Sequence, residues 1–323
     1  MEIMNIEEAK KYFITSLSYA QLSKHTITAY TQDLNQWINS LTKTELQDLN
    51  FMDFEAYFAY LQSLDLKVSS LKRKRLVIHR FLKYCYDKKL CEERLFEFIT
   101  PIKYKKQHVP KEVLEPQEIT LLFKHFVKEI NLHKEKENRN DHANQIYYCS
   151  IRNYLVISIL LYTGCRANEA VSLSKKDINL NKKSLVLFTK GGKYNEIPTH
   201  DKLVEAFQFY YEEMEYLKGT EIYNLVQKSK FIFPSIKNPT DHIAPRTLHD
   251  VMKKIGKILN RPIHAHLFRH TFASYCIANQ MDITTLSSLI SHSNPAITLS
   301  IYTHEISANQ KRSEIKKLQF DFD

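Results

Sequence analysis

A tyrosine near the end of the chain, Tyr302, follows a histidine, His292, by ten residues in a short polar stretch. A phenolate can attack a phosphodiester, because it is a nucleophile and neighbouring cations take up the charge that develops around phosphorus. The chain has 19 tyrosines, and most tyrosines in a protein serve packing. Tyr302 is therefore a candidate nucleophile only if the other parts of a phosphoryl-transfer site occur elsewhere.

Arg166 is the first candidate cation. It follows Gly164, which ends the apolar run 154–162 and is a typical helix-stop signal. A helix that begins here places Glu169 on the same face at i+3, where its carboxylate can orient the guanidinium. An arginine at the start of a surface helix is common, so this pattern alone is weak.

Lys190 is the second candidate. It lies at the tip of a predicted hairpin, with Gly191 and Gly192, between the strand-like runs 184–189 and 194–197. A lysine on such a loop can reach a scissile phosphate, although an ordinary exposed lysine fits the same pattern.

His266 and Arg269 are spaced at i, i+3 and are expected on one helical face. Arginine binds phosphate through two parallel hydrogen bonds, and histidine can donate a hydrogen bond or a proton. His264, His266 and His270 also suggest a zinc site. No cysteine or acid at ligand spacing completes such a set, and the spacing matches no standard structural-zinc pattern, so no metal is expected.

In chain order the candidates are Arg166, Lys190, His266, Arg269, His292 and Tyr302. This order, with the local sequences around it, closely resembles the tyrosine recombinase (phage integrase) family. The matching stretches are residues 163–169, 189–193, 266–273 and 291–304, together with an N-terminal match over residues 23–34. Two departures are small: Ser291 stands where the family usually has glycine, and Cys165 stands where a hydrophobic residue is usual. The compact two-domain organisation most resembles Xer-type recombinases.

The resemblance implies a mechanism. Tyr302 attacks one DNA strand to give a 3′-phosphotyrosine and a free 5′-hydroxyl, while Arg166 and Arg269 bind the non-bridging oxygens. Lys190 is the implied acid that protonates the departing 5′-oxygen, and the two histidines of the set hydrogen-bond the phosphate. The covalent intermediate conserves the bond energy, so no cofactor, ATP or Mg²⁺ is expected.

The resemblance also implies the partners and the biological role. The expected substrate is double-stranded DNA with a specific inverted-repeat site, bound by a homotetramer or by a heterotetramer with a paralogue. The expected function is Xer-type chromosome dimer resolution, with an integrase or excisionase of a mobile element as the alternative. A type IB topoisomerase fits less well because of the N-terminal helices, and a non-catalytic DNA-binding protein would lack the complete set of reactive residues.

Length and composition indicate a helix-rich, two-domain protein, because 323 residues exceed one usual core and only 5 are glycine. The expected fold is mainly α with a small antiparallel hairpin or sheet: a helical core-binding domain over residues 1–100, a linker over 101–115 and a catalytic domain over 116–323, together forming a clamp on DNA. The polar stretch 129–144 is predicted to be an exposed loop. The acidic N-terminus is unlike a signal peptide and the five cysteines lack a disulfide or zinc pattern, so a cytoplasmic location is expected.

A net charge of +10 suggests a polyanionic partner. A predicted helix over residues 69–86 is especially basic and can bury one stripe while its other faces lie along phosphates. The candidate DNA-binding residues on it are Lys72, Arg73, Lys74, Arg75 and Arg80. A solvated helix face is the simpler interpretation of such a run.

Overall fold

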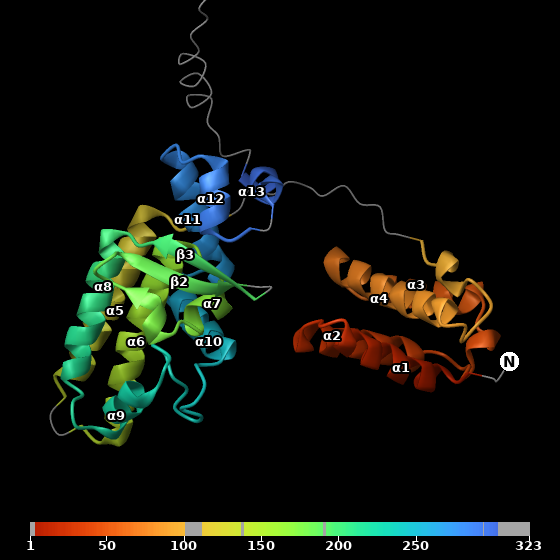
Figure 1. Ribbon diagram of the computed structural model, residues 1–323, viewed down its shortest axis with the longest axis horizontal. Helices are drawn as coiled ribbons and strands as arrows, with labels where there is room; N and C mark the ends of the chain where they lie inside the picture. The colour runs from red at the N-terminus through yellow and green to blue at the C-terminus, as the bar shows by residue number, and fades with distance from the viewer. Residues whose placement is uncertain (1–3, 101–111, 137–138, 190–191, 293, 303–323) are drawn as a thin grey trace, which may run out of the picture. The chain divides into compact units, whose positions relative to one another are not determined.

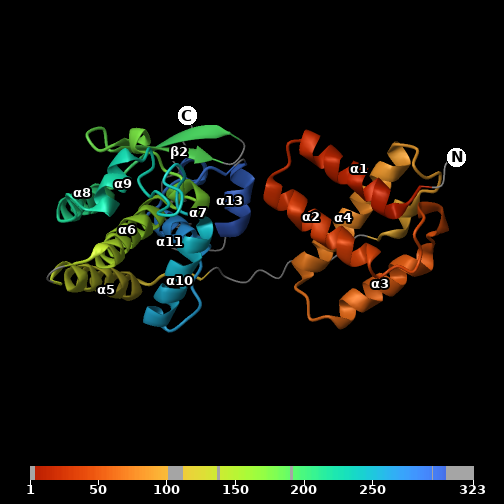
Figure 2. The same cartoon turned by 90° about the horizontal axis from the view of Figure 1, so that it is seen from below.

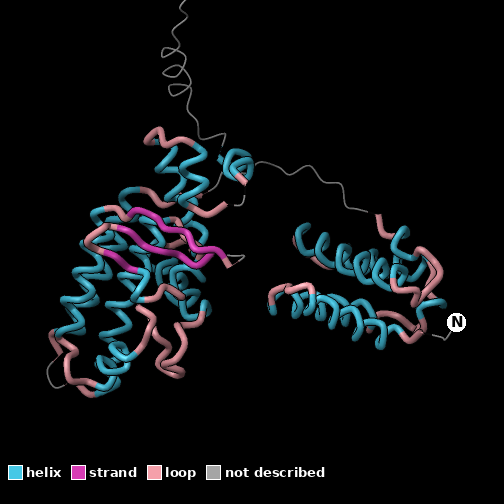
Figure 3. The backbone as a smooth tube through the Cα atoms, viewed as in Figure 1, coloured by secondary structure: helices cyan, strands magenta, loops and turns pink. Residues whose placement is uncertain are grey.

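The computed structural model describes residues 4–100, 112–136, 139–189, 192–292 and 294–302, and the chain divides into two compact units, residues 1–108 and 109–323. Both units are built mainly from helices, and the second also contains one small antiparallel sheet (Figures 1 and 3), which confirms the predicted fold class. Most of the predicted linker lies outside the described residues.

The N-terminal unit is a helical bundle. Its elements are α1 (Ile6–Tyr19), α2 (Lys24–Ile38), η1 (Leu46–Asp48), α3 (Phe51–Ser63), α4 (Val68–Asp87) and η2 (Leu95–Phe98). The hydroxyl of Ser23 accepts a hydrogen bond from the Thr26 amide (3.2 Å) and caps α2, as the sequence predicts. Helix α4 packs against α1, α2 and η2 and so runs through the middle of the bundle (Figure 2).

Aromatic side chains form the centre of this bundle. Trp37 is fully buried, and its ring lies 5.9 Å from that of Phe54 and 6.0 Å from that of Phe81 between centroids. Each of the three residues lies on the apolar stripe of a different helix, which is why the helical spacing in the sequence predicts the inward faces correctly.

A buried acid also organises the bundle. Asp33, which is 3% exposed on α2, pairs with Arg73 (2.9 Å) and with Lys74 (2.9 Å), and Lys74 also donates to Gln36. Lys74 is 9% exposed and faces the interior, which differs from its predicted contact with DNA phosphates. The physical reason is that a buried carboxylate requires counter-charges beside it.

The C-terminal unit contains the remaining helices and the sheet. Its elements are α5 (Pro116–Lys134), α6 (Asp141–Thr163), α7 (Ala167–Val171), η3 (Lys175–Asp177), β1 (Ile178–Asn179), β2 (Ser184–Thr189), β3 (Lys193–Pro198), α8 (Asp201–Glu215), α9 (Glu221–Lys228), α10 (Pro245–Leu259), α11 (Ala265–Ala278), α12 (Ile283–Leu289) and α13 (Pro295–Tyr302). Helix α6 is central, with 15 of its 23 residues buried, and α5 and α8 lie along it (Figure 1). Among all described helices, none is long and apolar enough to cross a membrane.

The prediction of a loop over 129–144 is too wide, because among its described residues only 135, 136, 139 and 140 lie outside α5 and α6. Helices α5 and α6 extend into this stretch from both sides, and Asn140 caps α6 by accepting a hydrogen bond from the Ala143 amide (2.9 Å). Polar residues of this stretch also take part in packing. Lys134 pairs with the buried Glu213 (2.9 Å) and Asn144 is only 6% exposed, so a polar composition alone does not indicate a loop.

The predicted hairpin is confirmed. Strands β2 and β3 pair antiparallel, with Phe188 opposite Tyr194 and Thr189 opposite Lys193, and the two-residue strand β1, which was not predicted, extends the sheet on the other side of β2. Lys190 at the tip lies outside the described residues.

Replacing Asp33 by alanine should lower the free energy of unfolding of the N-terminal unit by about 3 kcal/mol, because the buried Lys74 ammonium loses its counter-charge. Trp37 is the only tryptophan of the chain and lies in this unit, so urea unfolding followed by its fluorescence measures the change directly. Asp87→Ala is the matched control, since it breaks an exposed pair with Lys83 and should cost about 0.5 kcal/mol or less. Equal losses in the two variants would contradict the role given to Asp33.

Candidate active site

The site begins at the end of α6. Gly164 ends this helix with a φ of +61°, and a Cβ atom built on it would lie 2.5 Å from Cδ1 of Phe272 on α11. Glycine is required here for two reasons, because its backbone is left-handed and because α11 approaches it closely.

Arg166 comes two residues later and occupies the N-cap position of α7. Its backbone amide donates to one carboxylate oxygen of Glu169 (2.8 Å), and its Nη1 atom pairs with the other (2.8 Å). The predicted pairing at i, i+3 is therefore confirmed. Nη2 of the same guanidinium donates to the carbonyl of Ser291 (3.2 Å), which is distant in sequence.

Arg269 on α11 is only 4% exposed. Its Nη1 atom donates to the carbonyl of Gly164 (3.0 Å) and its Nη2 atom to that of Ile290 (2.6 Å). Both acceptors are uncharged, so these bonds orient the guanidinium without cancelling its positive charge. The residue thus joins the end of α6 to the end of α12.

His292 follows the turn over residues 288–291, which ends α12. Its amide donates to the carbonyl of Ser287 (3.0 Å), and its Nδ1 atom lies 2.7 Å from Oγ1 of Thr298 on α13. Partial burial, and then the positive charges of Arg269 and Arg166, lower the pKa of His292 to about 4. Three residues predicted from separate stretches of sequence, Arg166, Arg269 and His292, therefore come together around one turn.

The other predicted histidine, His266, is exposed in the first turn of α11, and its ring stacks 6.3 Å from that of His270. His264 caps the same helix, with Nδ1 accepting a hydrogen bond from the Leu267 amide (3.0 Å). Of the three histidines that lie close together in the sequence, one therefore serves as a helix cap.

Tyr302 is the last residue of α13, and its side chain lies outside the described part of the structure, as does Lys190. Thr298 lies one helical turn before Tyr302. Because Thr298 is fully buried against His292, the helix that ends at the tyrosine is attached to the arginine–histidine cluster. Thr298 is not singled out by the sequence, since a threonine in a short helix carries no signal of its partner.

The basic helix α4 presents its cations unequally. Lys72 and Arg80 are exposed, and Arg80 donates to the hydroxyl of Tyr30 (3.1 Å). Arg75 donates to a main-chain carbonyl of residue 100 (3.0 Å) and lies 4.1 Å above the ring of Phe58. Arg73 is paired with the buried acid of α2. Among the five candidate DNA-binding residues of α4, Lys72 and Arg80 are therefore the two that are exposed.

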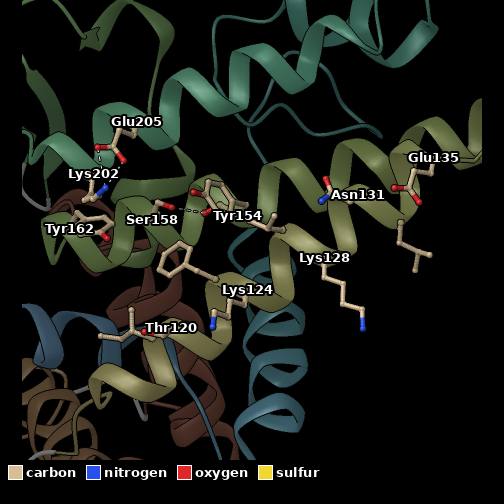
Figure 4. Close-up of a pocket in the computed structure, with 14 residues that line it drawn as sticks. Thr120, Lys124, Lys128, Asn131, Glu135, Tyr154, Ser158, Tyr162, Lys202 and Glu205 are labelled. Carbon is tan, nitrogen blue, oxygen red and sulfur yellow. Dashed lines mark hydrogen bonds and ion pairs between the residues drawn. The ribbon is translucent and has the colours of Figure 1, made fainter.

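A groove of about 820 Å³ lies between α5, α6 and α8 (Figure 4). Lys124, Lys128 and Lys202 line it beside Tyr154 and Tyr162. None of the predicted catalytic residues that the structure describes lies among its lining residues. The groove and the cluster of Arg166, Arg269 and His292 are therefore separate features of this unit.

His292 should titrate near pH 4 in the DNA-free protein, whereas an exposed histidine titrates near 6.5. Because the folded state resists protonation, it binds fewer protons than the unfolded state below pH 6.5, so this residue lowers stability as the pH falls from 6.5 towards 4. An NMR titration of the histidine rings measures the midpoint, with His292→Gln to assign the signal. Arg166→Gln should raise the midpoint by removing one cation, and a midpoint above 6 in the unmodified protein would contradict the described geometry.

Each of the two units of the chain matches a known family model. Residues 132–308 match the model of the phage integrase family, and residues 10–89 match its N-terminal SAM-like domain. The chain is 26% identical to tyrosine recombinase XerC of Pediococcus pentosaceus, over 94% of this chain and 93% of that protein. It is 27% identical to tyrosine recombinase XerC of Staphylococcus aureus strain bovine RF122, over 93% and 92%.

Solved structures share the fold. The Tn1549 transposon integrase in complex with transposon right end DNA aligns with a TM-score of 0.65 at 15% identity, over 97% of this chain and 99% of that one. XerH recombinase bound to palindromic difH aligns with a TM-score of 0.64 at 16% identity, over 90% and 80%. The family match spans more than half of the sequence, including the whole arginine–histidine cluster. The chain therefore belongs to the phage integrase family, the tyrosine recombinases, which are DNA strand-exchange enzymes.

Proposed function

We propose that this recombinase cuts and rejoins DNA with Tyr302 as the nucleophile. The phenolate oxygen attacks the scissile phosphorus, a bond from tyrosine to the 3′-phosphate forms, and the bond to the 5′-oxygen breaks. A 5′-hydroxyl of the partner duplex then attacks the phosphotyrosine and releases the enzyme. The single observation that best supports this proposal is the convergence of Arg166, Arg269 and His292 on the turn that precedes the helix of Tyr302.

The two arginines are proposed to hold the non-bridging oxygens. The guanidinium of Arg269 is buried and oriented by two carbonyls, and that of Arg166 is oriented by Glu169. Cations fixed in advance stabilise the negative charge of the transition state without reorganising during the reaction. Two guanidinium groups supply the positive charge that a metal ion supplies in other phosphoryl-transfer enzymes, so the proposed reaction needs no cofactor.

Lys190 is proposed to protonate the departing 5′-oxygen, and His266 to hydrogen-bond the phosphate. His292 is neutral at physiological pH because of its lowered pKa, so it can accept or donate a hydrogen bond. We assign it to the phosphate and to the proton of the attacking tyrosine.

We propose that the enzyme is of the Xer type and acts in the cytoplasm on a specific inverted-repeat site in double-stranded DNA. Residues 1–100 are the proposed core-binding domain and residues 116–323 the proposed catalytic domain. Four protomers, identical or of two paralogous kinds, would join two DNA sites in chromosome dimer resolution. Support comes from the XerC relatives, which align with this chain over 93% and 92% of their own length.

A recombinase of a mobile element is the second candidate, because the Tn1549 transposon integrase and XerH recombinase share this fold equally, with TM-scores of 0.65 and 0.64. The two roles share their chemistry and differ in their DNA sites. Recombination between paired chromosomal sites, compared with recombination at the ends of an inserted element, separates them. A type IB topoisomerase would relax supercoils without exchanging strands between two sites.

Tyr302→Phe should retain DNA binding and form no covalent protein–DNA adduct on a nicked suicide substrate, because the attacking oxygen is removed. Gel electrophoresis under denaturing conditions detects the adduct. Tyr211→Phe, which changes an exposed tyrosine on α8, is the matched control and should form adducts at the normal yield. Adducts of Tyr302→Phe near the normal yield would refute the assignment of the nucleophile.

Lys72→Ala should weaken binding to all DNA sequences and reduce the slope of log K against log[salt] by about 0.9, because one fewer counterion is released. Lys74→Met is the comparison on the same helix, since Lys74 is buried against Asp33. It should leave the salt slope unchanged and lower the stability instead. A slope that falls for Lys74→Met but not for Lys72→Ala would overturn the proposed DNA-binding face.

A further inference from the structure

The turn that holds both arginines also receives a side chain from the sheet. Asn195 lies on β3, and its Nδ2 atom lies 2.9 Å from the carbonyl of Ser288 and 2.8 Å from Oγ of Ser291. The carbonyl of Leu289 lies 3.5 Å away. One amide group from the hairpin thus faces three oxygen atoms of the end of α12.

Ser291 is strained at this point. Its φ is +55°, in the left-handed region that L-residues other than asparagine and aspartate rarely adopt. Glycine at this position would adopt such a φ without strain. Here a serine occupies it, and its hydroxyl is bonded to Asn195. The hydrogen bond offsets part of the strain.

The same strained residue sets the geometry of the site. The carbonyl of Ser291 accepts from Arg166, the carbonyl before it accepts from Arg269, and the residue after it is His292. The two carbonyls belong to the peptides on either side of Ser291. A change in the backbone dihedral angles of this residue would therefore move the two acceptors relative to each other and shift the backbone of the histidine.

We propose that Asn195 is a positioning residue for strand cleavage. It ties β3 to the turn over residues 288–291, so that the hairpin and the arginine–histidine cluster keep one fixed arrangement. The inference rests on the catalytic roles proposed for Arg166, Arg269 and His292. The proposed positioning comes from the hydrogen bonds that the Asn195 NH₂ group donates to oxygen atoms of the turn. The effect should therefore depend on this donor group and not on the size of the side chain.

The test is single-turnover cleavage of a saturating suicide substrate. Asn195→Asp places a carboxylate of nearly the same shape against three oxygen atoms, and Asn195→Ala removes the bond. Both should slow cleavage by about 10- to 100-fold, because small displacements of catalytic groups have effects of this size, with the Kd for DNA changed less than about 2-fold. Glu196→Gln, on the exposed side of the same strand, is the matched control and should cleave normally.

A second experiment distinguishes a positioning role of Asn195 from a general effect on stability. Ser291→Gly removes the strain, so the double variant Asn195→Ala with Ser291→Gly should recover at least part of the lost cleavage rate. The two changes should also be non-additive in thermal unfolding, which needs no catalysis. Normal cleavage by folded Asn195→Ala and Asn195→Asp, or additive effects of the two changes on stability, would overturn the proposal. Arg166→Ala and Arg269→Ala report separately on the proposed function: if either cleaves normally, the catalytic roles fail whether or not Asn195 and Ser291 are coupled.

Discussion

The buried guanidinium of Arg269 is held by the carbonyls of Gly164 and Ile290, and the rest of the site depends on this pair of bonds. A buried cation is costly unless its donors are satisfied, so the two carbonyls must lie at fixed positions. They belong to the ends of α6 and α12, and therefore Arg269 fixes these two helix ends relative to each other. Arg166 lies just after the end of α6, and His292 lies just after the end of α12. The bonds of Arg269 therefore help to position both residues.

Local features of the fold are predictable from the sequence because their causes are local. The cap at Ser23, the glycine stop at Gly164 and the hairpin over 184–197 all depend on residues within a few positions of each other. The bounds of the loop within 129–144 are harder to predict, because composition does not distinguish the polar ends of two helices from the loop between them. The burial of Lys74 was missed for a different reason: it depends on an acid 41 residues away, which no local pattern reveals.

In the site, too, local features are predictable from the sequence and contacts between distant residues are not. The pairing of Arg166 with Glu169 follows from their spacing, and the order of the motifs predicts that Arg269 and His292 belong to the same site. Motif order does not predict what holds these groups in place. Thr298 and Asn195 are ordinary polar residues in the sequence, and their importance comes only from tertiary contacts with the turn before and after His292.

The bond between Thr298 and His292 has a consequence for how α13 can move. Thr298 and Tyr302 lie on one helix, separated by a single turn, so the helix cannot withdraw without breaking the contact with the histidine. Withdrawal would move the backbone at Tyr302 and release the imidazole in the same event. The placement of the proposed nucleophile and the orientation of the histidine are therefore coupled, and one cannot change without the other.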